Sequence, residues 1–190
     1  MIAFFVELFE LESIVFPRSL YPKEVRVTGK PDQVIFSDGS VSAFGSVSYV
    51  RWKLETGKWW SMLLLSKSKI APKSRITVPR LELNGAVLSK RLEDFISADL
   101  DLEFGNIYHL VDSSTVLRYL HKQDAKLKPY EGICVREIQR AGKFLEGRLH
   151  NWSWVETHSN LANWATKPRS VVELKQGGFW QKALIFFKMM

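Results

Sequence analysis

The sequence predicts an α/β domain with a mixed sheet and helices packed on it. Three β-rich runs come first, within residues 34–65, and the short turn segments between them favour an antiparallel meander. After residue 79, helical and extended patterns alternate, which is typical of strands joined through helical crossovers. A chain of 190 residues has room for one such domain.

The strands of the meander end at recognisable turns. Residues 34–36 form a short apolar run that ends at Ser-Asp-Gly-Ser, residues 37–40, a sequence favoured in turns. Residues 45–52 and 59–65 are rich in β-branched and aromatic residues, and Glu-Thr-Gly at 55–57 separates them. The sequence therefore predicts three consecutive antiparallel strands.

A long amphipathic helix is predicted to begin near Pro79, because proline is favoured in the first turn of a helix. Its apolar residues recur at helical spacing on one face: Leu81, Leu88, Leu92 and either Phe95 or Ile96. Such a stripe is typical of a helix that packs on a sheet.

Strands and helices alternate in the rest of the chain. Residues 107–111 are a fourth apolar run, and Asp-Ser-Ser-Thr at 112–115 is typical of a helix start. A helix over 130–144, a strand over 152–155 and a helical stretch over 161–165 follow. We therefore expect a mixed sheet of five strands, the three-stranded meander plus parallel strands.

The composition, 46% apolar and 25% charged, is typical of a globular domain and excludes a disordered chain. The single cysteine, Cys134, excludes an internal disulfide. No segment approaches the roughly 20 apolar residues of a membrane span, so we expect a cytoplasmic or nuclear protein without a membrane partner. The expected organisation is an irregular arm over residues 1–30, a domain over 31–168 and a tail over 169–190.

The net charge of +7 is concentrated in part of the chain. Residues 51–90 hold nine Lys or Arg and two Asp or Glu. Clustered basic residues suit the phosphates of a nucleic acid, although a solvated basic face is an equally good interpretation of charge alone. The candidate nucleic-acid-binding residues are Lys67, Lys69, Lys73, Arg75 and Arg80.

Three acidic residues stand where strands end and helices begin. Asp38 ends the first strand, Asp112 directly follows the fourth, and Glu82 lies in the first turn of the long helix. Sites in α/β sheets gather at such strand ends. Carboxylates brought together repel one another unless a cation neutralises them, and oxygen ligands suit Mg²⁺ or Mn²⁺. Two such ions about 4 Å apart can activate water and stabilise the leaving oxygen in phosphodiester hydrolysis.

Each of the three also has a simpler interpretation. Asp38 can be a turn former before Gly39, and Asp112 can be a helix cap. Glu82 can be favoured by the helix dipole alone. Taken one at a time, the residues leave these alternatives open.

Five segments carry a shared set of motifs: residues 34–49, 66–72, 76–88 with Pro-Arg-Leu-Glu-Leu at 79–83, 111–117 and 151–168. Together they resemble the ribonuclease H domain of BEL/Pao-type LTR retrotransposon polyproteins. The resemblance runs from about residue 7 to about residue 168, and Pro-Arg-Leu-Glu-Leu is its most specific part. Residues 7–20 are similar to the stretch that joins reverse transcriptase to this domain in that family.

The resemblance implies a ribonuclease H-like fold and a metal-dependent attack of water on the RNA strand of an RNA–DNA hybrid. By motif, the catalytic and metal-binding positions fall on Asp38, Glu82, Asp112 and Asn163. The implied cofactors are two Mg²⁺ or Mn²⁺ ions. The implied partners are the hybrid and, within a full polyprotein, reverse transcriptase.

The chain departs from the family pattern at its fourth acidic position. Asn-Leu-Ala-Asn at residues 160–163 stands where the pattern has Asn-Pro-Ala-Asp, so Asn163 replaces an aspartate. An amide offers one oxygen to a metal but no charge, which weakens the site for its second ion. Trp154 replaces a histidine of the closing strand. His158, on a nearby loop, can assist product release or be a bystander.

Two functions from different classes follow. The first is a ribonuclease H, favoured by the retention of three carboxylates. The second is a catalytically weakened or dead nucleic-acid-binding relic of the same fold, favoured by Asn163. A DNA-strand-transfer enzyme of the same superfold is a third and weaker possibility. Of the seven tryptophans, Trp59, Trp60 and Trp164 are candidates for stacking on bases.

Overall fold

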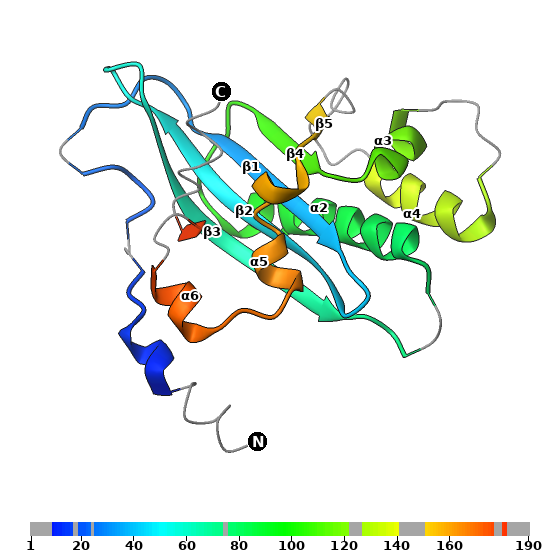
Figure 1. Ribbon diagram of the computed structural model, residues 1–190. Coiled ribbons are helices and arrows are strands. Elements are labelled where there is room, and N and C mark those ends of the chain that lie inside the picture. The colour runs from blue at the N-terminus through cyan, green and yellow to red at the C-terminus, as the bar shows by residue number, and fades with distance from the viewer. Residues whose placement is uncertain are drawn as a thin grey trace.

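The computed structural model describes residues 9–16, 19–23, 25–73, 76–121, 127–140, 151–176 and 180–181. Its centre is a five-stranded sheet with the order β3-β2-β1-β4-β5 (Figure 1). The strands are β1 (Asp32–Gly39), β2 (Ala43–Lys53), β3 (Trp59–Ile70), β4 (Ile107–Val111) and β5 (Trp152–Trp154). β1, β2 and β3 pair antiparallel, whereas β4 pairs parallel with β1 and with β5. The predicted mixed sheet is confirmed.

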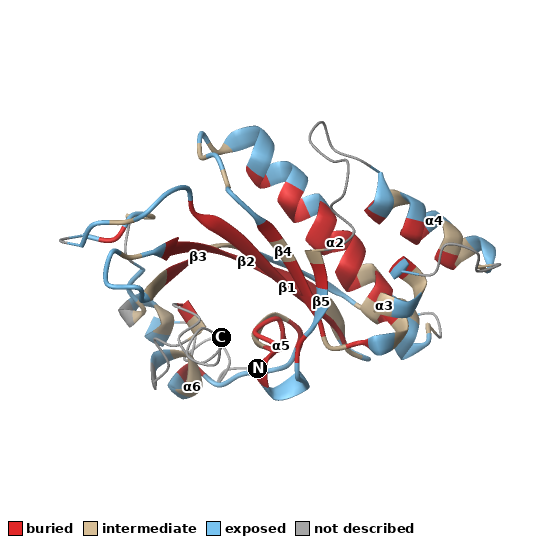
Figure 2. Ribbon diagram, turned by 90° about the horizontal axis from the view of Figure 1, so that it is seen from above, coloured by how far each residue is buried: buried red, intermediate tan, exposed pale blue. Residues whose placement is uncertain are grey.

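Helices cover both faces of this sheet. The described helices are η1 (Leu11–Ser13), α2 (Val78–Asp99), α3 (Ser114–His121), α4 (Pro129–Gln139), η3 (Thr157–Ser159), α5 (Asn163–Thr166) and α6 (Val171–Gln176). Figure 2 shows α2, α3 and α4 on one face and α5 and α6 on the other. No described helix is long and apolar enough to cross a membrane.

The alternation of side chains along β1 divides the core between the two faces. Phe36 faces the α5 side, where it packs with Val47 and Leu161. Ile35 faces the α2 side and packs with Leu92. Both faces of a central strand are therefore apolar, which explains why residues 34–36 form an unbroken apolar run.

The structure changes or completes four details of the sequence prediction. β3 continues to Ile70, so residues 67 and 69 lie on a strand. α2 begins at Val78, which places Glu82 beyond its first turn. At the end of α2, Ile96 is buried and Phe95 is 56% exposed, because only one of two adjacent helical positions can face the sheet. The predicted helix over 130–144 ends at Gln139 in α4, and residues 141–150 lie outside the described part.

The arm and the tail meet on the α5 side of the sheet. The Phe16 and Trp180 rings are 5.6 Å apart in an edge-to-face contact. The Tyr49 hydroxyl donates to the carbonyl of Trp180 at 2.6 Å, and Lys175 pairs with Glu10 at 3.2 Å. Residues on both sides of the expected domain limits therefore pack together in space.

Candidate functional site

The parallel pairing of β1 and β4 places two aspartates side by side. Ser37 pairs with Val111 at the last paired position of the two strands. The next residues are Asp38 and Asp112, so both carboxylates emerge at the same end of the sheet. Asp38 is 7% exposed and pairs with Gly45 of β2 inside the ladder. Its interpretation as a turn former is therefore wrong.

Two glycines bring Glu82 to the same place. A Cβ on Gly39 would lie 2.3 Å from the backbone N of Glu82, and a Cβ on Gly85 would lie 2.6 Å from the carbonyl oxygen of Asp38. No side chain fits in either gap. The second turn of α2 therefore packs backbone to backbone against the end of β1, which carries Glu82 toward the aspartates.

Hydroxyl and amide donors from other elements hold the three carboxylates. The pairs are Thr166 with Asp38, Ser113 with Glu82, and both Thr157 and Asn160 with Asp112. Ser113 also accepts the amide N–H of Val116 at 3.3 Å. Ser113 rather than Asp112 thus acts as the side-chain cap of α3, and the simpler interpretation of Asp112 as a helix cap loses its support.

The three carboxylates influence one another electrostatically. Burial raises the pKa of Glu82 above its usual value, and the charges of Asp112 and Asp38 raise it further, against the hydrogen bond from Ser113. Burial also raises the pKa of Asp112, with a further contribution from Asp38. The strand end is therefore an acidic, half-buried site where a bound cation relieves repulsion.

The donor types suit a hard cation, but the present side-chain positions are not those of a closed metal site. Among the described residues, no three His, Cys, Asp or Glu side chains form a group that could hold a metal ion. The internal hydrogen bonds engage Oδ2 of Asp38 and Oε2 of Glu82. The other oxygen of each carboxylate is not used by these bonds. Oxygen ligands of this kind fit Mg²⁺ or Mn²⁺ chemically.

The sequence of this segment matches a known family model. The model of the Pao retrotransposon-like RNaseH-like domain matches residues 2–113. The chain belongs to this family. The resemblance inferred from the motifs is thus confirmed, together with the ribonuclease H-like fold, and the matched residues include Asp38, Glu82 and Asp112.

Solved ribonuclease H structures are also similar to the chain. The N-terminal RNase H domain of Rv2228c from Mycobacterium tuberculosis has 18% identity, with 69% of this chain and 86% of that chain covered and a TM-score of 0.44. RNase H1 from Halobacterium salinarum has 13% identity, with 78% and 100% covered and a TM-score of 0.42. LC11-RNase H1, solved in complex with an RNA/DNA hybrid, has 13% identity, with 77% and 99% covered and a TM-score of 0.42. No curated protein matches the chain by sequence.

Asn163 lies outside the segment that the family model matches. Its side chain is buried, and its Nδ2 donates to the carbonyl of Thr157 at 2.6 Å. Its Oδ1 accepts a hydrogen bond from the ammonium of Lys167. Because Thr157 also bonds Asp112, Asn163 is connected to the carboxylates through one intervening residue.

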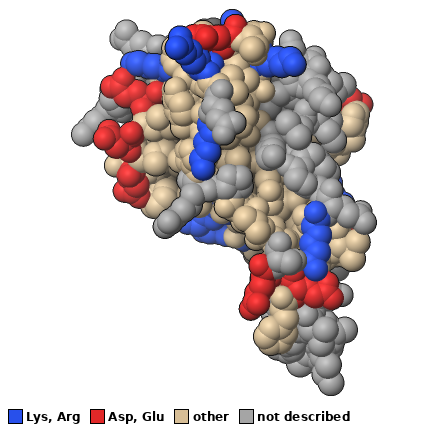
Figure 3. All heavy atoms as spheres, turned by 90° about the vertical axis from the view of Figure 1, so that its left-hand side faces the viewer, with Lys and Arg blue, Asp and Glu red and all other residues tan. Residues whose placement is uncertain are grey.

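The described residues of the predicted basic set lie on β3, in the segment directly after it and on α2. Ser46 of β2 pairs with both Ser37 and Lys67, so Lys67 lies level with the end of β1 but two strands away, about 10 Å. By strand alternation, Lys67 and Lys69 share the α2 side of the sheet, whereas Asp38 faces the α5 side. Lys67, Lys69 and Lys73 are exposed. The side of the molecule shown in Figure 3 carries several basic groups toward its top and acidic groups along its left edge and at its lower end.

A fourth residue of the predicted basic set, Arg80, is engaged within the protein. It pairs with Glu131 of α4 at 2.9 Å and lies over the ring of Tyr130. Arg75 lies outside the described residues. The role of the whole set in nucleic-acid binding stays a prediction.

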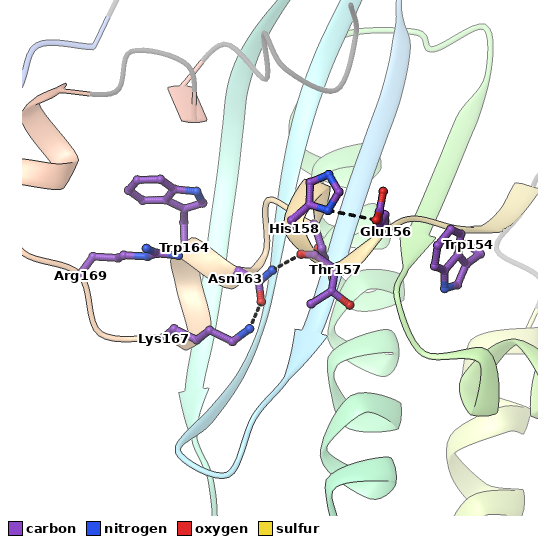
Figure 4. A pocket seen from close by; sticks show the side chains of 9 residues that line it. Trp154, Glu156, Thr157, His158, Asn163, Trp164, Lys167 and Arg169 are labelled. Carbon is purple, nitrogen blue, oxygen red and sulfur yellow. Dashed lines mark hydrogen bonds and ion pairs between the residues drawn. The ribbon is translucent and has the colours of Figure 1, made fainter. Parts of the chain in front are cut away.

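A pocket opens beside the carboxylates on the α5 side, between the end of β5 and α5 (Figure 4). Its volume is about 690 Å³. The lining includes Trp154, Thr157, Asn160, Asn163 and Lys167. Since Thr157 and Asn160 also hold Asp112, the pocket borders directly on the candidate site. Sequence patterns gave no signal for it, because its walls come from turns that meet only in the fold.

The tryptophans selected from the sequence are used in internal contacts. Arg51 lies 4.1 Å from the ring centre of Trp59, and the partly buried Trp60 packs against the core cluster of Val50, Trp52 and Met62. Arg169 lies over Trp164 at 4.5 Å, while Trp180 stacks on Trp164 at 6.2 Å. Base stacking on these three rings stays a prediction. The internal contacts cover part of the ring surface that such stacking needs.

His158 lines the same pocket and pairs with Glu156 at 3.2 Å. Figure 4 shows the two side chains directed toward each other at the pocket rim. The structure therefore keeps His158 near the candidate site. Its part in product release stays a prediction.

Proposed function

We propose that this domain is a divalent-metal-dependent nuclease that cleaves the RNA strand of an RNA–DNA hybrid. The observation that carries the proposal is the convergence of Asp38, Glu82 and Asp112 at one end of the sheet, where burial and mutual repulsion raise the pKa of Glu82 and Asp112. Such a group of carboxylates lowers the stability of the fold unless a bound cation neutralises their charge.

Asp38, Glu82 and Asp112 would hold Mg²⁺ or Mn²⁺ through their carboxylate oxygens. The metal supplies activation of a water and stabilisation of the leaving oxygen. The chain itself orients the carboxylates: Thr166 holds Asp38, and Ser113 holds Glu82. These hydrogen bonds leave one oxygen of each of those two carboxylates directed elsewhere, and a bound ion would draw the acidic side chains closer together.

The family pattern of four acidic positions would serve two ions. Asn163 contributes an amide oxygen that already accepts from Lys167, so it brings no negative charge to the second ion. We therefore expect the second ion to bind weakly and turnover to be slow. Mn²⁺, which tolerates imperfect coordination better than Mg²⁺, should support more activity.

A binding relic without turnover is the second candidate. It is favoured by the same Asn163 and by the absence, among the described residues, of a closed group of three metal-binding side chains. In either case, residues 9–16 and the domain would belong to a larger polyprotein in which reverse transcriptase supplies the hybrid.

The deciding experiment is cleavage of an end-labelled RNA–DNA hybrid with Mg²⁺ or Mn²⁺. We expect slow cleavage by the parent, faster cleavage by Asn163→Asp and none by Asp38→Asn. Asp99→Asn, an exposed substitution at the end of α2, is the matched control and should cleave like the parent. Hybrid binding without cleavage by the parent or Asn163→Asp, with either metal, would favour the relic.

A further inference from the structure

The pocket beside Asp112 combines an exposed aromatic ring with a cation. Trp154 is 58% exposed, yet its indole N–H donates to the carbonyl oxygen of Asp112 at 3.1 Å. The hydrogen bond fixes the ring next to a candidate metal ligand. Among the described residues, no ring or cation stacks on Trp154, in contrast to Trp164. An exposed, oriented indole of this kind is a surface on which a nucleobase can stack.

Lys167 supplies the cation of the pocket. Its ammonium bonds the side-chain oxygen of Asn163, which is a neutral partner. The other basic groups in the pocket have acidic partners, since Arg169 pairs with Glu173 at 3.0 Å and His158 with Glu156 at 3.2 Å. Within the described part of the pocket, Lys167 is thus the cation whose charge no carboxylate offsets.

The available charge of Lys167 depends on the substitution at position 163 that sets this chain apart from its family pattern. An aspartate at position 163 would form an ion pair with Lys167, four residues further on, and would offset its charge. The asparagine instead orients the ammonium through one hydrogen bond and leaves its charge available. The change at position 163 therefore removes a negative charge from the candidate metal site and leaves a cation available to an anion in the same place.

We propose that this pocket binds an unpaired stretch of one strand next to the hybrid, with a phosphate at Lys167 and a base on the ring of Trp154. The proposal rests on the substrate class proposed above. Phosphate recognition by an ammonium and stacking on an indole are the two contacts that a single strand offers together. The pocket borders Asp112 through Thr157 and Asn160, so the bound strand continues directly into the candidate site.

The test measures binding of a labelled RNA–DNA hybrid with a single-stranded overhang in EDTA, at several salt concentrations, so that no cleavage is involved. Lys167→Gln should lower the salt slope by about one, because one phosphate contact is lost. Trp154→Ala should weaken binding by roughly tenfold without changing the slope, because stacking releases no counterions. Lys167→Arg should restore the parent slope. Lys58→Gln, an exposed lysine in the turn between β2 and β3 at the opposite end of the sheet, is the matched control.

Asn163→Asp gives a second, independent readout. If it acts by pairing with Lys167, it should weaken metal-free binding in the parent but have much less effect in the Lys167→Gln background. An equal effect in both backgrounds would contradict the pairing. Unchanged melting temperatures establish that each variant folds.

The outcomes separate this inference from the proposed enzymatic activity. If the parent cleaves hybrid while Lys167→Gln and Trp154→Ala bind like the Lys58→Gln control, the strand-binding pocket is wrong and the nuclease stands. If the parent never cleaves but both variants lose binding as described, the pocket stands and the relic is the better account.

Discussion

The hydroxyl of Ser113 lies 2.6 Å from Oε2 of Glu82 and donates a hydrogen bond to it. The Oγ of Ser113 in turn accepts a hydrogen bond from the amide N–H of Val116 in the first turn of α3. One side chain therefore both caps α3 and fixes a carboxylate that projects from α2. The candidate site and the packing of these two helices are coupled through Ser113.

Replacing this hydroxyl should affect both stability and titration. Ser113→Ala removes a helix cap, which costs about 1 kcal/mol of unfolding free energy. It also removes the hydrogen bond that holds the pKa of Glu82 down, so that pKa should rise further. Urea unfolding and an NMR titration of Glu82 measure the two effects. Ser113→Thr keeps the hydroxyl and should retain both properties, and an unchanged pKa in Ser113→Ala would contradict the coupling.

The glycine that lets α2 approach β1 should resist substitution. Gly85→Ala would normally stabilise a helix by up to about 1 kcal/mol. Here the added Cβ would lie 2.6 Å from the carbonyl oxygen of Asp38, so we expect a loss of about 2 kcal/mol. Gly132→Ala in α4 is the matched control, since its Cβ meets only a Leu127 carbon at 3.9 Å. Gly132→Ala should raise the free energy of unfolding, whereas Gly85→Ala should lower it. Chemical denaturation of both variants measures the two changes.

The acidic cluster should make stability depend on pH. When folding raises the pKa of a carboxyl group, the group adds its full contribution to the free energy of unfolding at pH values below its unfolded pKa of about 4. That contribution is lost as the pH rises through the raised pKa of the folded state. The raised pKa values of Glu82 and Asp112 therefore predict that these two groups contribute a loss of stability as the pH rises above about 4.

Asp112→Asn should remove part of this loss and raise the melting temperature at pH 7 without metal. An asparagine oxygen still accepts from Thr157 and Asn160 but adds no charge. Thermal melts in EDTA between pH 4.5 and 8 provide the measurement. A variant that melts below the parent at pH 7, with the same pH dependence, would show that repulsion is not what strains the site.

Divalent cations should stabilise the parent by binding this cluster. We expect Mn²⁺ or Mg²⁺ to raise the melting temperature at pH 7 and to have less effect at acidic pH, because the raised pKa values of Glu82 and Asp112 favour their protonated forms there. Asp38→Asn should reduce the shift at pH 7. Asp99→Asn, whose carboxyl is exposed at the end of α2, should leave it unchanged. An equal shift in all three proteins would mean that the ions bind elsewhere.

The sequence by itself determined the order and type of the elements and the position of three carboxylates within them. Strand and helix periodicity are local properties, so residues 34–36 and the stripe from Leu81 to Ile96 could be interpreted without the fold. The family motifs added that Asp38, Glu82 and Asp112 belong together. The strand register, once observed, explains why the two aspartates are neighbours.

Only the tertiary structure decided what surrounds those carboxylates. The backbone contact at Gly85 and the bond from Thr166 to Asp38 join segments whose approach no local pattern specifies. The sequence likewise did not show that Trp154 is exposed, because it shares a short strand with Trp152, which is buried. The physical reason is that periodicity reports which side of an element is apolar, whereas a site depends on which elements meet at their ends and how closely their backbones pack.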